Sequence, residues 1–193
     1  MLFGKPAKLQ DGRYFLKVTQ EDGSRVVHQV NGVSFVSFEG AQAVIKTDSE
    51  LFSDIDELIL TQAMGSKVEW FGKEISDETV SSAYQKSVNP ESELSASFAT
   101  IKGEIVTMFY DTQKNTLSGV DTGVPVDVLL ELSGLVFTKR AFEPVWKIIQ
   151  VRVKATPKTK FPREYLFKDD PVEEEPDMQQ KGMQDHLVNQ EWF

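Results

Sequence analysis

Side chains that could carry catalysis or bind a metal are few and scattered in this 193-residue sequence. Cysteine is absent, which removes thiol nucleophiles, thiolate metal ligands and disulfides together. The two histidines are His28, in a strand-like stretch, and His186, near the C-terminus. The acidic group Asp54, Asp56 and Glu57 fits the start of a helix, where carboxylates interact favourably with the helix dipole. We therefore predict no enzyme activity, no metal and no cofactor.

Residues 144–154 combine aliphatic, aromatic and cationic side chains in a strand-like alternation. Successive side chains of a strand point to opposite faces. One predicted face is aliphatic and holds Val145, Ile149, Val151 and Val153. The other holds Trp146, Ile148, Gln150, Arg152 and Lys154. Proteins that bind single-stranded nucleic acids stack bases on aromatic rings and neutralise phosphates with cations. The second face favours such a surface, with a core position for Trp146 as the alternative.

Two nearby patterns add residues of the same kinds. A short predicted hairpin turn precedes this strand and carries Lys139, Arg140 and Phe142, after Phe137 at the end of another strand. Near the N-terminus, one face of a predicted strand carries Arg13, Phe15 and Lys17, and the other carries Tyr14, Leu16 and Val18. The N-terminal pattern is weaker support, because any exposed strand would look similar.

Charge is distributed unevenly along the chain. The net charge is −9, yet residues 139–168 carry nine Lys and Arg against two acids. Residues 169–193 carry one Lys against eight acids and have little to bury, which is typical of disorder. We predict a folded domain over residues 1–168 and a disordered acidic tail over residues 169–193. The terminal pair Trp192-Phe193 is then exposed, and we predict that it binds a partner protein.

The remaining pattern predicts a mainly β domain, since 40% of the residues are hydrophobic and turn signals recur. The predicted elements are a β meander over 12–38 with turns at 20–24 and Asn31-Gly32, helices over 53–64 and 77–88, and strands over 99–110, 125–137 and 144–154. No apolar stretch is long enough for a membrane span, and the N-terminus lacks the apolar run of a signal peptide. We expect a protein of a reducing compartment that is not secreted and has no membrane contact.

Two segments resemble a known family. The first is Trp70-Phe71-Gly72-Lys73 followed by residues 75–80, and the second comprises residues 132–137 and 142–151. Together they resemble the OB-fold single-stranded DNA-binding proteins of phages and large eukaryotic DNA viruses, over about half of the chain. The acidic tail that ends in aromatic residues is similar to that of the phage replication members, where it recruits replication proteins.

The resemblance implies an OB-type β-barrel with about two inserted helices that binds single-stranded DNA without sequence preference. The expected role is viral or phage DNA replication or recombination, in the cytoplasm or nucleus of an infected host cell, with replication proteins bound through the tail. Phosphate contacts are expected from Lys139, Arg140, Lys147, Arg152 and Lys154. Base stacking is expected from Trp146 and from Phe137 or Phe142. Trp70 is either a platform or core, Phe71 is expected in the core, and homo-oligomerisation stays open.

A rival interpretation is a viral structural or scaffold β-protein that binds only other proteins, with its acidic surface as the interface. A third and weaker interpretation is an enzyme with scattered carboxylates. Binding of a labelled oligo-dT at two salt concentrations separates the first two, because phosphate contacts must weaken with salt.

Overall fold

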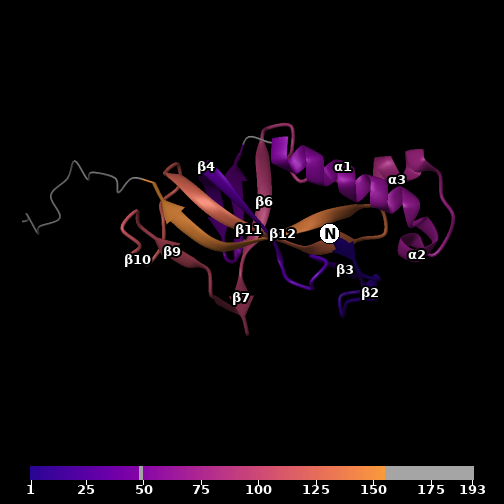
Figure 1. Cartoon of the computed structure of the whole chain (residues 1–193), viewed down its shortest axis with the longest axis horizontal. Coiled ribbons are helices and arrows are strands. Elements are labelled where there is room, and N and C mark those ends of the chain that lie inside the picture. Colours follow the sequence, from indigo (N-terminus) through magenta and orange to yellow (C-terminus); the bar gives the residue numbers. More distant parts are fainter. Residues whose placement is uncertain (48–49, 155–193) are drawn as a thin grey trace, which may run out of the picture. The chain divides into compact units, whose positions relative to one another are not determined.

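A closed five-stranded barrel lies at the centre of the computed structural model, which describes residues 1–47 and 50–154 (Figure 1). Its strands are β4 (Val26–Glu39), β5 (Gln42–Lys46), β6 (Glu93–Phe98), β11 (Pro125–Phe137) and β12 (Phe142–Val153). The strands pair in the order β11-β4-β5-β6-β12, and β12 returns to β11. Only the β6–β12 contact in this ring is parallel. The predicted OB-type barrel is therefore confirmed.

The barrel is filled by apolar side chains that alternate along its strands. Inward-facing residues with almost no exposed surface include Phe35, Ile45, Leu94, Leu130 and Ile148. Each strand of the ring contributes one of these residues, so they form one core. Burying a Leu, Ile or Phe side chain contributes ~1.5–3 kcal/mol to stability.

The hairpin of β11 and β12 is longer than the barrel. Its far half pairs with β3 (Tyr14–Thr19) through Gly134–Phe137 of β11. β3 in turn pairs with β1 (Leu2–Phe3) and β2 (Ala7–Lys8). The predicted turn at residues 20–24, between β3 and β4, is confirmed, and Gly23 has the positive φ of 81° that such a turn requires.

Three helices, rather than the expected two, lie between β5 and β6. They are α1 (Glu50–Gly65), α2 (Lys67–Phe71) and α3 (Asp77–Ala83). α1 buries one face through Phe52, Ile55, Ile59 and Ala63. The extra helix is the Trp70-Phe71 motif itself, which makes one turn and ends at Gly72, whose φ of 71° is the left-handed cap conformation. No helix among the described residues is long and apolar enough to cross a membrane.

The predicted strand over 99–110 is wrong, because the chain leaves the barrel there as a separate hairpin. Lys102 and Gly103 have φ of 51° and 87° and form its turn. The segment divides into β7 (Thr100–Ile101), β8 (Glu104–Ile105) and β9 (Met108–Tyr110), and β10 (Thr116–Leu117) follows. β9 rejoins the sheet in parallel with β12 and pairs with β10, at the end of the barrel away from α2 and α3 (Figure 1).

Two predicted boundaries also need correction. Asn31-Gly32 is not a hairpin turn but an irregularity inside the continuous strand β4, where Gly32 has a φ of 70°. The Gly32 N–H donates to the Asp127 carboxylate. A glycine whose positive φ would suit a turn therefore allows a distortion within a strand at this position. The helix predicted over 77–88 ends at Ala83, because Tyr84 is extended and bridges to Phe142.

Candidate nucleic-acid interface

Trp146 is not a stacking platform in this structure, because its side chain is only 2% exposed. Phe52 of α1 packs against it edge-on, with 5.3 Å between the ring centroids. The indole Nε1–H donates to Ser87 Oγ at 3.1 Å. The centroid of the His28 ring lies 6.1 Å from that of Trp146, and burial lowers the pKa of the imidazole. Trp146 is therefore part of the core, and half-buried His28 packs beside it.

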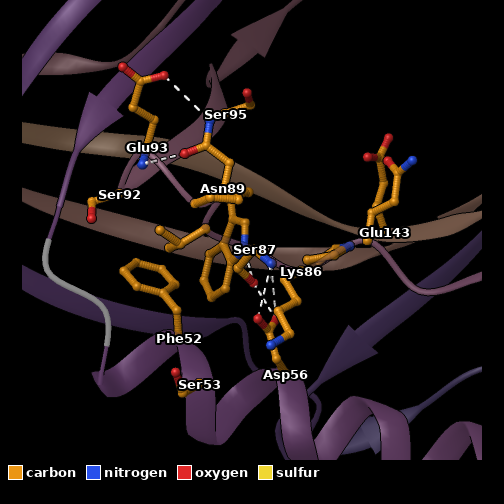
Figure 2. A pocket seen from close by; sticks show the side chains of 15 residues that line it. Phe52, Ser53, Asp56, Lys86, Ser87, Asn89, Ser92, Glu93, Ser95 and Glu143 are labelled. Carbon is orange, nitrogen blue, oxygen red and sulfur yellow. Dashed lines mark hydrogen bonds between the residues drawn. The ribbon is translucent and has the colours of Figure 1, made fainter. Parts of the chain in front are cut away.

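A buried polar cluster supports Trp146. Asp56 of α1 accepts hydrogen bonds from the Ser87 hydroxyl at 2.6 Å, from the Ser87 backbone N–H and from the Tyr84 hydroxyl at 2.6 Å. Burial raises the pKa of Tyr84, and the bond to Asp56 raises it further, so Tyr84 remains a donor. Figure 2 shows Asp56 and Ser87 facing each other at the edge of a pocket of 730 Å³. The cluster fastens α1 and the segment after α3 to β12.

The phenylalanines expected to stack on bases are also buried. Phe137 and Phe142 stack on each other with a centroid distance of 5.4 Å and an angle of 9° between the rings. The ring of Trp70 meets Phe137 edge-on, and the ring of Phe71 meets Phe137 and Phe142 edge-on. The end of the hairpin is therefore an aromatic cluster beneath α2, with Trp70 buried in the core and Phe71, which was expected in the core, only half-buried against it.

A β-bulge explains why strict alternation misplaced Trp146. Leu129 pairs with Gln150 and Leu130 pairs with Ile148, so Ile149 is an extra residue in β12. The alternation changes phase at that point. Trp146 and Ile148 point inward before the bulge, and Val151 and Val153 point inward after it. Lys147, Gln150, Arg152 and Lys154 consequently lie outside the barrel.

At the hairpin turn, cations and rings border a groove of 570 Å³, which we call the tip groove. Lys139 and Arg140 are exposed there, and Thr138 holds the turn by accepting the N–H groups of Arg140 and Ala141. On the other walls lie Lys73 of the Trp-Phe-Gly-Lys motif, half-buried Phe71 and Tyr14, which is 45% exposed. Within residues 1–47 and 50–154, neither Lys139, Arg140 nor Lys73 forms an ion pair.

The cations at the other end of β12 are already paired. Arg152 Nη2 lies 2.6 Å from one oxygen of the buried Asp127 carboxylate, and Lys154 Nζ lies 3.0 Å from the other. Burial raises the pKa of Asp127, but hydrogen bonds from Arg152, Lys154 and the backbone lower it by more, so its pKa is below the usual range. One carboxylate balances two cations, and one positive charge remains.

The N-terminal candidates are separated by the structure. Arg13 pairs with Asp11 at 2.6 Å, Phe15 packs over Gly134, and Lys17 is exposed. The ring at the groove is instead Tyr14, which the alternation had placed on the opposite face from Phe15. The partner-binding candidates Trp192 and Phe193, and the tail from residue 169, lie outside the described residues.

Residues 31–169 match a protein family described as a family of unknown function, DUF5871. The chain belongs to this family. The range matched to DUF5871 takes in α1 to α3 and the barrel strands apart from the start of β4, and it includes the hairpin turn at the tip groove. A search of curated proteins finds no match.

Three solved structures of the single-stranded DNA-binding protein from bacteriophage Enc34 show a partial likeness to this DUF5871 chain. A C-terminal truncation has a TM-score of 0.42 and 11% identity, covering 78% of this chain and 94% of that chain. A complex with single-stranded DNA has a TM-score of 0.41 and 11% identity, covering 79% and 95%. A third structure has a TM-score of 0.41 and 12% identity, covering 84% of this chain and 97% of that chain. At this level the likeness says nothing about what this DUF5871 chain binds.

Proposed function

We propose that this chain binds single-stranded DNA without sequence preference, and that the tip groove is its main contact. The observation that carries the proposal is the juxtaposition of unpaired Lys73, Lys139 and Arg140 with the exposed ring of Tyr14 around one groove. Cations that have no carboxylate partner among residues 1–47 and 50–154 are free to neutralise phosphates. A ring with almost half its surface exposed offers a face on which a base can stack.

The position of the groove suits this function. OB-fold proteins bind oligonucleotides on the face of the second and third barrel strands and at the loops that follow the first and fourth strands. The turn after β11, the fourth strand of this barrel, is the one that carries Lys139 and Arg140. Lys147 lies further along β12, on the outside of the same hairpin. Arg152 and Lys154 contribute less to phosphate binding, because Asp127 already balances part of their charge.

Replacing both tip cations, Lys139→Gln with Arg140→Gln, is expected to weaken oligo-dT binding by about tenfold at low salt. Each phosphate contact on a single strand contributes about 0.7 to the slope of log affinity against log salt, so the slope should fall by ~1.4. Fluorescence anisotropy with a labelled oligo-dT at several salt concentrations measures both quantities.

The matched control removes two exposed cations elsewhere, Arg25→Gln with Lys102→Gln, and leaves the same net charge. It should bind oligo-dT nearly as the wild type does, because Arg25 and Lys102 lie away from the tip groove. Equal losses of oligo-dT affinity in the two double variants would show that net charge determines the affinity. That result would contradict the assignment of DNA binding to the tip groove.

We further infer a role in viral or phage DNA replication or recombination inside the infected host cell, with replication proteins recruited by the tail. Replacing Trp192 and Phe193 with alanine is expected to abolish pull-down of a helicase or polymerase partner and to leave oligo-dT affinity within about twofold. Anchor aromatics at interfaces contribute ~2 kcal/mol or more, and DNA affinity does not depend on them. Loss of DNA binding or of thermal stability in this variant would contradict the assignment.

Protein binding is the second candidate, and one observation favours it. The hairpin of β7 and β8 leaves the barrel and exposes a group of apolar side chains just before and after its turn, namely Ile101, Ile105, Val106 and Met108. Exposed apolar groups of this kind often mark contacts with other proteins. Failure to bind oligo-dT at any salt concentration would favour this candidate over DNA binding.

A further inference from the structure

A second pocket lies at the end of β12 opposite to the tip groove. It has a volume of 370 Å³ and lies between the barrel wall and the β9–β10 hairpin, with Gln29, Tyr110, Lys114, Leu129, Gln150 and Arg152 among its lining residues. Volumes of this size are within the range of small-ligand sites. The pocket is about ten residues along β12 from Phe142, or ~33 Å at ~3.3 Å per residue.

Arg152 is held in place on one wall of this pocket. Its Nε and Nη2 both donate to Asp127 Oδ2, at 3.2 and 2.6 Å. Asp127 is itself buried and fixed by the Gly32 N–H and by Lys154. The guanidinium is 55% exposed as a side chain and keeps N–H groups directed elsewhere than at Asp127. A cation with a fixed geometry loses little entropy when it binds an anion.

Lys114 also lines this pocket, and it belongs to a loop that has its own hydrogen bonds. Asp111 Oδ1 accepts the N–H groups of Gln113 and Asn115 at 2.8 and 2.9 Å, and Oδ2 accepts the Asn115 amide at 2.8 Å. The side-chain hydrogen bond from Asn115 is the main reason that the pKa of Asp111 is lowered, so this carboxylate remains charged and keeps the loop closed. Lys114 has a φ of 68°, a conformation that favours glycine, and its ammonium has no ion pair with any described residue.

Tyr110 lines the same pocket as these two cations, and it is half-buried and in register with Arg152 on the neighbouring strand. Its hydroxyl has no hydrogen-bond partner in the described part of the chain. Gln150 adds an exposed amide, which can both donate and accept. Asp127 and Asp111 offset two of the three cations Lys114, Arg152 and Lys154. The single positive charge that remains matches one phosphodiester rather than a polyanion.

We propose that this pocket binds one nucleotide of a single strand whose other part occupies the tip groove. The base stacks on Tyr110, and its phosphate contacts Lys114 and Arg152. This inference rests on the proposed function and adds a second contact to it. A strand long enough to reach both places binds more tightly than a short one, because the second contact is then intramolecular.

The variant Lys114→Gly tests the proposal without threatening the fold, because glycine adopts a φ of 68° more readily than lysine. Lys102→Gly is its matched control, since Lys102 also has a positive φ, of 51°, in a hairpin turn but lies away from the pocket. Tyr110→Leu is the second variant. Affinities are measured for oligo-dT of about four and about sixteen nucleotides, the two ends of the range of OB-fold site sizes.

Wild type and Lys102→Gly are expected to bind the longer strand much more tightly than the shorter. Lys114→Gly and Tyr110→Leu should bind the longer strand about tenfold less tightly than the wild type, and the shorter strand nearly as well. Equal affinities of Lys114→Gly and Lys102→Gly for the longer strand would overturn the second contact alone, provided that the tip variants still weaken both strands. Absence of binding by the wild type to either strand would overturn both proposals.

Discussion

Replacing Trp146 with alanine is expected to lower the free energy of unfolding by ~3–5 kcal/mol, the range for removing a large buried aromatic ring. The ring is 2% exposed, contacts Phe52 edge-on and donates its indole N–H to Ser87. Its removal leaves a cavity beside the Asp56 and Ser87 cluster and takes one hydrogen bond from it. A chemical denaturation series should show a lower midpoint with an unchanged m-value.

The matched variant is Tyr14→Ala, which removes an aromatic ring that is 45% exposed in the tip groove. It should change the midpoint little and weaken oligo-dT binding, the reverse of the Trp146 result. If Trp146→Ala is unfolded under all conditions, Trp146→Phe keeps most of the volume, loses the bond to Ser87 and should show a smaller loss of the same sign. An unchanged midpoint for Trp146→Ala would contradict the core position.

Replacing Gly134 with alanine is expected to destabilise the chain by ~3 kcal/mol or more, at the upper end of overpacking costs. A Cβ atom at this position would lie 2.1 Å from the Leu16 carbonyl oxygen and 2.5 Å from the Phe15 ring. The ring can rotate away, but the carbonyl belongs to β3, which pairs with β11 at this point. Relief of the clash therefore requires β3 to separate from the hairpin.

Gly119→Ala is the control for this substitution, because a Cβ there meets nothing within 4 Å and its φ is not positive. Alanine at such a site is expected to be neutral or to stabilise by ~0.4–1 kcal/mol. Thermal denaturation of the two variants should differ by many degrees. Equal melting temperatures would mean that β3 does not lie against β11 as described.

Sequence patterns predicted an element correctly where a single local rule, such as an apolar run between turn residues, determines the structure. The strand over 125–137 has the bounds of β11, because its apolar run is flanked by turn residues. The barrel class followed from the strand pattern together with the family resemblance. Two positions went wrong because the same residue type serves two structures: Gly32 has the φ of a turn but belongs to a distorted strand, and Gly103 forms a turn inside a segment that looks continuous.

The sequence placed some residues of the candidate site correctly, and each error has its own physical cause. Strand alternation holds only until a bulge, and Ile149 shows no sequence signal of one, so Trp146 was assigned to the cationic face. The exposure of Lys139 and Arg140 followed from the sequence, because a hairpin turn is exposed in any packing. Tyr14 was not among the predicted site residues. It lies at the start of β3, which pairs with the part of β11 that extends beyond the barrel. Tyr110 and Lys114 were hidden by the strand predicted over 99–110, although the Asp111 to Asn115 spacing is a recognisable loop signal.

Binding of single-stranded DNA at the tip groove is tested by titrating the whole chain with labelled oligo-dT at low and high salt, with unlabelled duplex of equal length as competitor. We expect tight binding at low salt, a steep loss of affinity with rising salt, and weak competition by duplex, because paired bases cannot stack on Tyr14. Absence of binding at low salt, or duplex that competes as well as the single strand, would contradict it.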